Sequence, residues 1–365
     1  MQNIYEKYAK LLVNYSLRLK KDDKLLIRSS YLAEPLLKEV YREALLAGAN
    51  PEMKIAINGA DKIFYDNASD EQLEYISPNT QYTYKNFDAM LMIIAPFNMK
   101  ELQNVDPNKK QTAQMARAEL SKLVMHRSAD GSLNWNLCVF PTDAAAQECG
   151  MSKEEYEHFV YSACFLLDDD PVEKWKEIEN FQQKIIDYLN GKETIRYSSK
   201  DVDVTFSVKG RKWINSAGKN NMPSGEVFTC PVEDSVNGKV RFSYPGFYLG
   251  QEIEDITLEI KDGEVVKWDA GKGKELLDKI MDIPGARHFG EAAIGTNKGI
   301  TKFTKNMLFD EKLAGTIHMA IGASITEAGG TNESAIHWDM LADMHDGGEI
   351  YADNELIYRD GDFLI

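Results

Sequence analysis

The chain has 365 residues, of which 43% are hydrophobic and 27% are charged, as in a soluble globular protein large enough for two domains. Its 42 lysine and arginine residues against 58 aspartate and glutamate residues give a formal net charge of −16. This acidic balance argues against nucleic acid or an anionic membrane surface as a partner, and it favours the attraction of cations.

The four cysteines, Cys138, Cys149, Cys164 and Cys230, form no CxxC pair and no disulfide framework. Reduced, buried thiols are therefore favoured over a redox role. The start of the chain does not resemble a signal peptide, and the longest apolar run, residues 89–97, is far shorter than a membrane span. We predict a cytoplasmic protein that does not enter a membrane.

Short apolar segments alternate with helical patterns over the first half of the chain. The segments at residues 24–28, 53–57, 89–95 and 135–140 are predicted to be strands. The third is hydrophobic without alternation, which is typical of a parallel sheet covered on both faces. These features predict an N-terminal α/β layered domain with a mostly parallel sheet, from residue 1 to residue 192.

Helix signals between these strands have recognisable ends. Residues 4–19 and 35–47 each carry one apolar face, and Gly48 is placed to end the second helix. Ser152 and Glu155 have the spacing of a capping box. Asp170 and Pro171 are predicted as the N-cap and first residue of a helix that ends before residue 191.

The second half of the chain, residues 193–365, changes to an antiparallel pattern. Apolar residues alternate from Val202 to Val208, which predicts a strand with one buried face. The pairs Asn237–Gly238 and Asp262–Gly263 predict hairpin turns, and a helix from residue 274 is expected to stop before Pro284. We predict a C-terminal α+β domain whose antiparallel strands carry a metal site.

Four of the six histidines lie between residues 288 and 345. Imidazole and carboxylate groups are the ligands of zinc and similar divalent cations. His337 and Asp339 are two residues apart, so an extended strand would point both to one face, where they could share an ion. The intervening Trp338 would point to the opposite face, into the core.

Three further residues are weaker candidates when taken one at a time. Glu226 follows a Pro-Ser-Gly turn, where a lone glutamate is more often solvated. Glu291 could equally begin a helix. His318, between two apolar residues, would more often be a hydrogen-bonded core histidine than a ligand. Their spacing alone does not show that the fold brings them together.

Four motifs carry a family resemblance: NMPSGEVFTCP, GEAAIGTN, GTIHMAIG and SAIHWDM, in this order from residue 221 to residue 340. Together they closely resemble the aminopeptidase T / aminopeptidase S family of dinuclear metallo-aminopeptidases. The likeness covers most of the C-terminal half and is looser in the N-terminal half. Any one of these motifs would be a weak signal, whereas all four in order are specific.

The resemblance implies a two-domain subunit, a homodimer that encloses a cavity, and hydrolysis of N-terminal residues from short peptides. It implies two divalent ions per subunit, zinc, cobalt or manganese, and no other cofactor. The metal ligands it implies are Glu226, Glu291, His318, His337 and Asp339. No catalytic base is assigned, because Ile325 stands where some members carry a tyrosine near the metals.

A second function of a different class uses part of the same set. His318, His337 and Asp339 alone would suit mononuclear non-haem iron, and a ring-cleaving dioxygenase is a known relative of this fold. Glu226 and Glu291 discriminate between the two functions, because a mononuclear iron enzyme does not need them. A binding protein that uses metal only for stability is disfavoured by the complete five-residue set.

Overall fold

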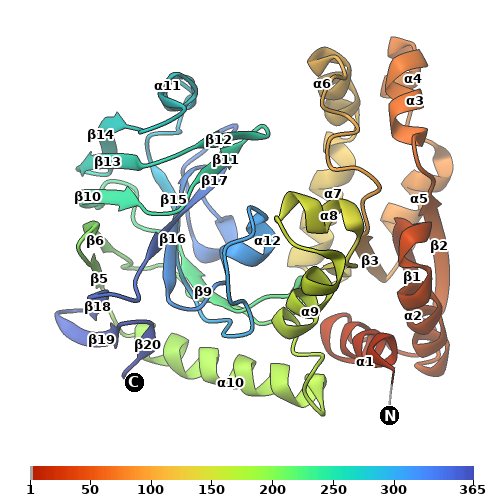
Figure 1. The fold of residues 1–365 in the computed structure, drawn as a ribbon, viewed down its shortest axis with the longest axis horizontal. Coiled ribbons are helices and arrows are strands. Elements are labelled where there is room, and N and C mark those ends of the chain that lie inside the picture. Colours follow the sequence, from red (N-terminus) through yellow and green to blue (C-terminus); the bar gives the residue numbers. More distant parts are fainter. Residues whose placement is uncertain (1–2) are drawn as a thin grey trace. The chain divides into compact units, whose positions relative to one another are not determined.

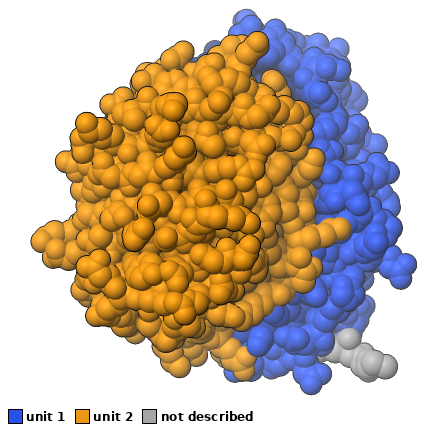
Figure 2. Space-filling view, turned by 60° about the vertical axis from the view of Figure 1, so that its left-hand side comes forward, with its two compact units in different colours: residues 1–174, 218–223 blue, residues 175–217, 224–365 orange. Residues whose placement is uncertain are grey.

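The computed structural model describes residues 3–365 and divides the chain into two compact units, coloured separately in Figure 2. Unit 1 comprises Met1–Lys174 and Gly218–Pro223, and unit 2 comprises Trp175–Ala217 and Ser224–Ile365. We retain a domain boundary near residue 192 as a proposal, because the first strand of the antiparallel sheet begins at Thr194. Within residues 3–365, no helix has the length and apolar character needed to cross a membrane.

A five-stranded parallel sheet lies at the centre of unit 1, with the strand order β2-β1-β3-β4-β8. Its strands β1, β2 and β3 are labelled in Figure 1. Its strands are β1 (Lys24–Ser30), β2 (Asn50–Ala56), β3 (Ala89–Ile94), β4 (Asn134–Val139) and β8 (Asn221–Met222). The first four correspond to the four apolar segments predicted as strands. The parallel N-terminal α/β layer is therefore confirmed.

The helices of unit 1 precede β1 or occupy the segments between these strands. They are α1 (Ile4–Lys10), followed by a π-helical turn (Leu11–Ser16), α2 (Glu34–Leu46), which follows a 3-10 turn (Tyr31–Ala33), α3 (Ala60–Asn67), α4 (Asp70–Glu74), α5 (Pro78–Asn86), α6 (Pro107–Ala116), α7 (Ala118–Ala129), α8 (Asp143–Glu148) and α9 (Lys153–Ala163). The predicted capping box is confirmed, because Ser152 and Glu155 each accept a hydrogen bond from the other's backbone N–H. Helix α10 (Pro171–Leu189) begins where Asp170 caps it, as predicted.

Unit 2 contains two larger antiparallel sheets (Figure 1). The eight-stranded sheet has the order β14-β13-β10-β6-β5-β18-β19-β20, with β5 (Thr194–Ser198), β6 (Val202–Ser207), β10 (Asn237–Phe242), β13 (Ile256–Lys261), β14 (Glu264–Asp269), β18 (Glu349–Ala352), β19 (Glu355–Arg359) and β20 (Asp362–Phe363). The five-stranded sheet has the order β17-β16-β15-β9-β7, with β7 (Ile214–Ser216), β9 (Glu226–Thr229), β15 (Phe289–Gly295), β16 (Thr316–Gly322) and β17 (His337–Asp343). The C-terminal α+β class is confirmed.

The remaining elements of unit 2 connect these sheets. They are the hairpin β11 (Gly246–Tyr248) and β12 (Gln251–Ile253), helices α11 (Lys274–Met281) and α12 (Met307–Asp310), and a 3-10 turn (Thr326–Ala328). The predicted Asp262–Gly263 hairpin is confirmed, because it joins the paired strands β13 and β14.

The predicted turn at Asn237–Gly238 is wrong. Both residues belong to β10, where Gly238 pairs with Val204 on one side and Ile260 on the other. A Cβ on Gly238 would lie 2.0 Å from the carbonyl oxygen of Asp203. The glycine therefore serves a close approach of two backbones within the sheet, and not a turn.

The hydrophobic core of unit 2 includes residues from both large sheets. Val204 and Phe206 of β6 belong to the same buried cluster as Ile294, Met319 and Trp338 of the five-stranded sheet. Each fully buried aliphatic or aromatic side chain of this kind contributes about 1.5–3 kcal/mol to folding. Because side chains alternate along a strand, the next residues on β15, β16 and β17 point to the opposite face of their sheet.

Candidate metal centre

One row of side chains crosses the three strands at the centre of the candidate site. Glu291 on β15 pairs with Ala320 on β16, and Ala320 pairs with Asp339 on β17. Residues that are directly opposite in neighbouring strands share a face. Glu291 and Asp339 therefore lie on one face of the sheet, with only the methyl group of Ala320 between them.

The two histidines lie on the same face by strand periodicity. His318 precedes Ala320 by two residues, and His337 precedes Asp339 by two. Trp338 is buried and belongs to the core cluster on the opposite face. The predicted alternation of His337, Trp338 and Asp339 along a strand is therefore confirmed.

Glu226 joins this face from a fourth strand. It begins β9 and pairs with Gly295, which lies on β15 four residues after Glu291. The structure therefore brings all five predicted ligand residues, from four neighbouring strands, to one face of the sheet.

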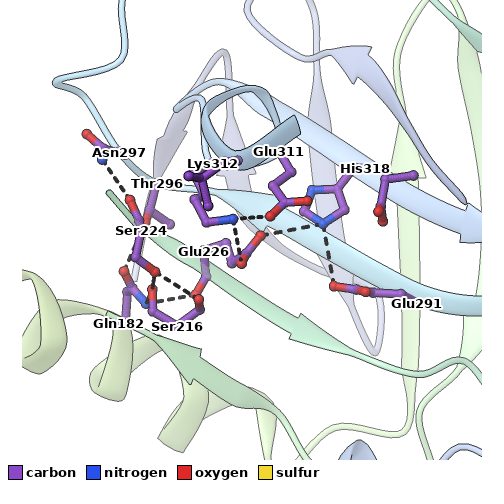
Figure 3. A network of polar contacts seen from close by, with 12 residues as sticks. Gln182, Ser216, Ser224, Glu226, Glu291, Thr296, Asn297, Glu311, Lys312 and His318 are labelled. Carbon is purple, nitrogen blue, oxygen red and sulfur yellow. Dashed lines mark hydrogen bonds and ion pairs between the residues drawn. The ribbon is translucent and has the colours of Figure 1, made fainter. Parts of the chain in front are cut away.

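His318 contacts both glutamates (Figure 3). Its Nε2 atom lies 3.5 Å from Oε2 of Glu226 and 3.5 Å from Oε1 of Glu291. The His318 side chain is 1% exposed and each glutamate side chain is 7% exposed. This half of the cluster is closed to solvent.

His337 contacts the remaining carboxylates. Its Nε2 atom lies 3.1 Å from Oε2 of Glu291 and 3.6 Å from Oδ1 of Asp339. Its Nδ1 atom lies 2.7 Å from the carbonyl oxygen of Ala323. A neutral His337 would donate its Nδ1–H there, leaving Nε2 as the ligand atom, which is how metal-binding histidines are usually oriented.

The His337 end of the cluster is the more open one. The side chain of His337 is 32% exposed and that of Asp339 is 14% exposed. Glu291, His337 and Asp339 offer ligand atoms that all lie within 4.8 Å of one another. These three residues could hold one ion at the solvent-accessible end.

Electrostatics at this face favour positive charge. Burial lowers the pKa of both histidines, but the neighbouring carboxylates outweigh it and raise the pKa of His318 to about 9 and that of His337 to about 11. Burial raises the pKa of Asp339, but the neighbouring His337 more than offsets this and lowers it. A site that holds protons this strongly between carboxylates also suits divalent cations.

The donor atoms pass a further test for a metal ion. Within residues 3–365, the buried atoms Oε2 of Glu226 and Oδ1 of Asp339 have no hydrogen-bond partner. Buried polar atoms are nearly always paired in folded proteins. Carboxylate oxygens left unpaired beside imidazole nitrogens fit a divalent cation.

Lys312 and Glu311 were not predicted from the sequence. Lys312 is fully buried; its Nζ atom lies 3.4 Å from Oε1 of Glu226 and also contacts the carboxylate of Glu311 (Figure 3). Burial, followed by the charges of Glu226 and Asp339, raises the pKa of Glu311 to about 7 against the opposing effect of Lys312. Both residues lie in the irregular segment between α12 and β16, where no strand or helix periodicity marks them.

Gln182 was also missed, because it lies on an amphipathic helix far away in sequence. It is fully buried on α10, and its Nε2 atom lies 2.8 Å from the carbonyl oxygen of Glu226 and 2.9 Å from Oδ1 of Asn215. Its Oε1 atom accepts a hydrogen bond from Thr296. These bonds, part of the network in Figure 3, connect α10 to the backbone of β9 and β7 beside the site.

The family model of thermophilic metalloproteases (M29) matches residues 1–363 of the chain. Aminopeptidase 2 of Geobacillus stearothermophilus is 30% identical, over 98% of this chain and 97% of that protein. Aminopeptidase T of Thermus thermophilus is 25% identical, over 98% and 95%. The solved structure of wild-type AmpT from Thermus thermophilus superposes with a TM-score of 0.83 at 23% identity, covering 99% of each chain, which shows a shared fold.

Proposed function

The chain belongs to the M29 family of thermophilic metalloproteases and is a metallo-aminopeptidase, and we propose that it releases N-terminal residues from short peptides at a centre of two divalent ions. The observation that carries this proposal is the convergence of five ligand-type side chains from four strands. We propose Glu226, Glu291, His318, His337 and Asp339 as the ligands, and zinc, cobalt or manganese as the metal.

The contacts of Glu291 support a bridging position for this residue. Its Oε1 atom faces His318 and its Oε2 atom faces His337. One ion position would then use Glu291, His337 and Asp339, and the other would use Glu291, His318 and Glu226. Three carboxylates would offset much of the charge of two dications.

The chemistry follows from this arrangement. Divalent ions, when bound, supply Lewis-acid activation of water and of the peptide carbonyl. Two hydrogen bonds keep the ligand residues in position. The carbonyl oxygen of Ala323 orients the ring of His337, and the side chain of Gln182 donates to the backbone carbonyl of Glu226. Substrate would reach the centre from the exposed His337 end, where Asp339 is available to attract the positive α-amine of a peptide.

The alternative function, a mononuclear iron dioxygenase, is not favoured. Glu226 and Glu291 directly contact the two histidines that would hold iron, and family membership points to hydrolysis. The deciding experiment is metal counting combined with a leucyl-anilide assay. Two ions per chain with anilide hydrolysis would support the proposal, and one firmly bound iron without hydrolysis would refute it.

We also propose that the protein is a homodimer, and its exposed edge strand β2 is the surface that supports this. Within residues 3–365, β2 pairs with β1 and with no other strand. Met53 and Ile55 in β2 and Ile57 just after it are 41%, 39% and 65% exposed. A long apolar edge strand is a template for pairing with another chain. Such an edge is costly to leave uncovered, because it also invites aggregation.

The sequence of β2 is complementary to itself. The amide of Asn50 points towards β1, where it donates to Asp23, so the alternating backbone groups of Met53 and Ile55 point outwards. Antiparallel pairing of two copies centred on Met53 would place Glu52 of each opposite Lys54 of the other. Within the described chain, neither Glu52 nor Lys54 has an ion-pair partner.

We place the enzyme in the cytoplasm as a further proposal. Cys138, Cys149, Cys164 and Cys230 are free thiols, and all but Cys149 are buried. Reduced thiols of this kind persist in the cytosol. Cell fractionation that recovered the protein only outside the cell would refute this location.

A further inference from the structure

Lys312 is the most unusual residue near the proposed ligands. Its side chain is fully buried, whereas lysine is almost never fully buried unless it is paired. It lies in the segment between α12 and β16, four residues before the strand that carries His318. The proposed chemistry gives it no task.

The two oxygens of the Glu226 carboxylate face different neighbours, Lys312 and His318. Oε1 of Glu226 lies 3.4 Å from the ammonium group, while Oε2 faces His318 at 3.5 Å and has no hydrogen-bond partner (Figure 3). Only Oε2 is therefore available to an ion on the His318 side. Glu311 also contacts the ammonium and holds it in place.

We propose that Lys312 is a fixed cation of the metal centre, which restricts Glu226 to binding through one oxygen and makes the two ion positions unequal in affinity. The position formed by Glu291, His337 and Asp339 fills first, and the position formed by Glu226 and His318 fills second. This inference rests on the proposed two-ion function and adds a role for a residue outside the five ligands.

The asymmetry follows from charge and from geometry. An ammonium group beside Glu226 repels a dication on that carboxylate, and the repulsion is strong where water is excluded. Within residues 3–365, no lysine or arginine forms an ion pair with Glu291 or Asp339. Because Lys312 forms an ion pair with Glu226 and not with these two carboxylates, its repulsion of a dication is weaker at the open end of the centre than at the closed end.

A purely structural role for Lys312 makes a different prediction. If the ammonium only offsets buried carboxylates, its removal would destabilise the fold, because breaking a buried ion pair leaves an uncompensated charge. Metal affinity would then fall at both positions or stay unchanged. The order and spacing of the two binding steps separate these roles.

The test is a titration of metal-free protein with cobalt(II). Binding is measured by calorimetry and by the visible absorption of the bound ion. The variants are Lys312→Met, which removes the ammonium, and Glu311→Gln, which keeps the ammonium but removes the carboxylate that offsets it. Glu311→Gln carries the test if Lys312→Met does not fold. Lys267→Met, at an exposed lysine on β14, is the matched control.

We expect two binding steps in the wild-type chain and in the control. In Lys312→Met the weaker step should tighten at least ~10-fold while the stronger step stays within about threefold of wild type, and in Glu311→Gln the weaker step should weaken further. A second step that is unchanged or weakened in folded Lys312→Met, or unchanged or tightened in Glu311→Gln, would overturn the role of Lys312. A wild-type chain that binds a single ion would instead refute the two-ion function itself.

Discussion

The carboxylate of Glu291 lies 3.1 Å from the imidazole of His337, although β16 runs between the strands that carry them. This approach depends on two small residues of β16. Ala320 is paired with Glu291, and Gly322 is paired with His337. The site thus requires small side chains in its middle strand as much as it requires ligands in the strands beside it.

Filling this gap should weaken metal binding without unfolding the chain. Ala320→Leu would place a branched side chain between Glu291 and Asp339, at a cost in stability of about 1–3 kcal/mol for overpacking. We expect at least ~10-fold weaker cobalt binding, measured by calorimetry, because ligands must be held in a set geometry to bind well. Ala292→Leu overpacks the core face of β15 and is the control: it should lower the melting temperature yet keep the ions. Unchanged binding in folded Ala320→Leu would contradict this account.

Sequence patterns anticipated the parts of this site that follow a period. The two-residue spacing of His337 and Asp339 predicted a shared face, because a strand alternates its side chains whatever its neighbours are. Glu226 gave no such signal, and only the order of four motifs placed it with the rest. Its position depends on the pairing of β9 with β15, which is a tertiary property.

Residues that act through tertiary contacts were not predictable in this way. In the sequence, Lys312 is a single basic residue next to acidic ones, and Gln182 is one of several polar residues on a long helix. The Asn237–Gly238 pair gave a false turn, because the glycine is required by the backbone of Asp203 and not by a hairpin. The role of each of these residues depends on contacts with residues far away in the sequence, and local sequence spacing does not predict such contacts.

Loss of the charge on Glu291 should separate turnover from stability. Glu291→Gln keeps the size of the side chain but removes the charge proposed to hold two dications together. We expect turnover to fall at least ~100-fold, as when a group that stabilises transition-state charge is removed, while the chain stays folded and melts no lower than the metal-free wild type. Near-normal turnover with two ions bound would show that Glu291 does not lie between them.

Ser152→Ala is the contrasting control for that variant. Ser152 accepts a hydrogen bond from the backbone of Glu155 and caps α9 in unit 1. Its loss removes a cap worth about 1 kcal/mol, so the melting temperature should fall while turnover is kept. Melting temperature and turnover are measured for both variants and compared with those of the wild type.

Metal removal should affect both activity and stability. Dialysis against a chelator should abolish peptide hydrolysis, and cobalt, zinc or manganese should restore it. An ion that binds only the folded chain stabilises it by about 2.7 kcal/mol when present at 100 times its dissociation constant, so the metal-free protein should melt at a lower temperature. Full activity after verified metal removal would be incompatible with the proposed centre.

Cleavage should require a free α-amine on the substrate. Asp339 stands beside the half-exposed His337 at the open end of the centre, where a positive amine would be attracted and its acetylated form would not. We expect release of N-terminal residues from unblocked di- and tripeptides and none from N-acetylated versions, followed by chromatography of the products. Equal rates on both would remove the amine from the mechanism.

If two copies of the chain pair through β2, dimerisation should depend on which charges lie opposite each other. In two copies paired about Met53, Lys54→Glu places a glutamate opposite Glu52 at both symmetry-related positions. Like charges directly opposite in a sheet are destabilising, so this variant should be largely monomeric in light scattering, and added salt should partly reverse the effect.

The double variant Glu52→Lys/Lys54→Glu restores opposite charges across the pair and should dimerise as wild type does. That rescue excludes a general loss of folding, because the double variant carries more changes than the single one. A single variant that stays dimeric, or a double variant as monomeric as the single, would exclude β2 as the pairing surface.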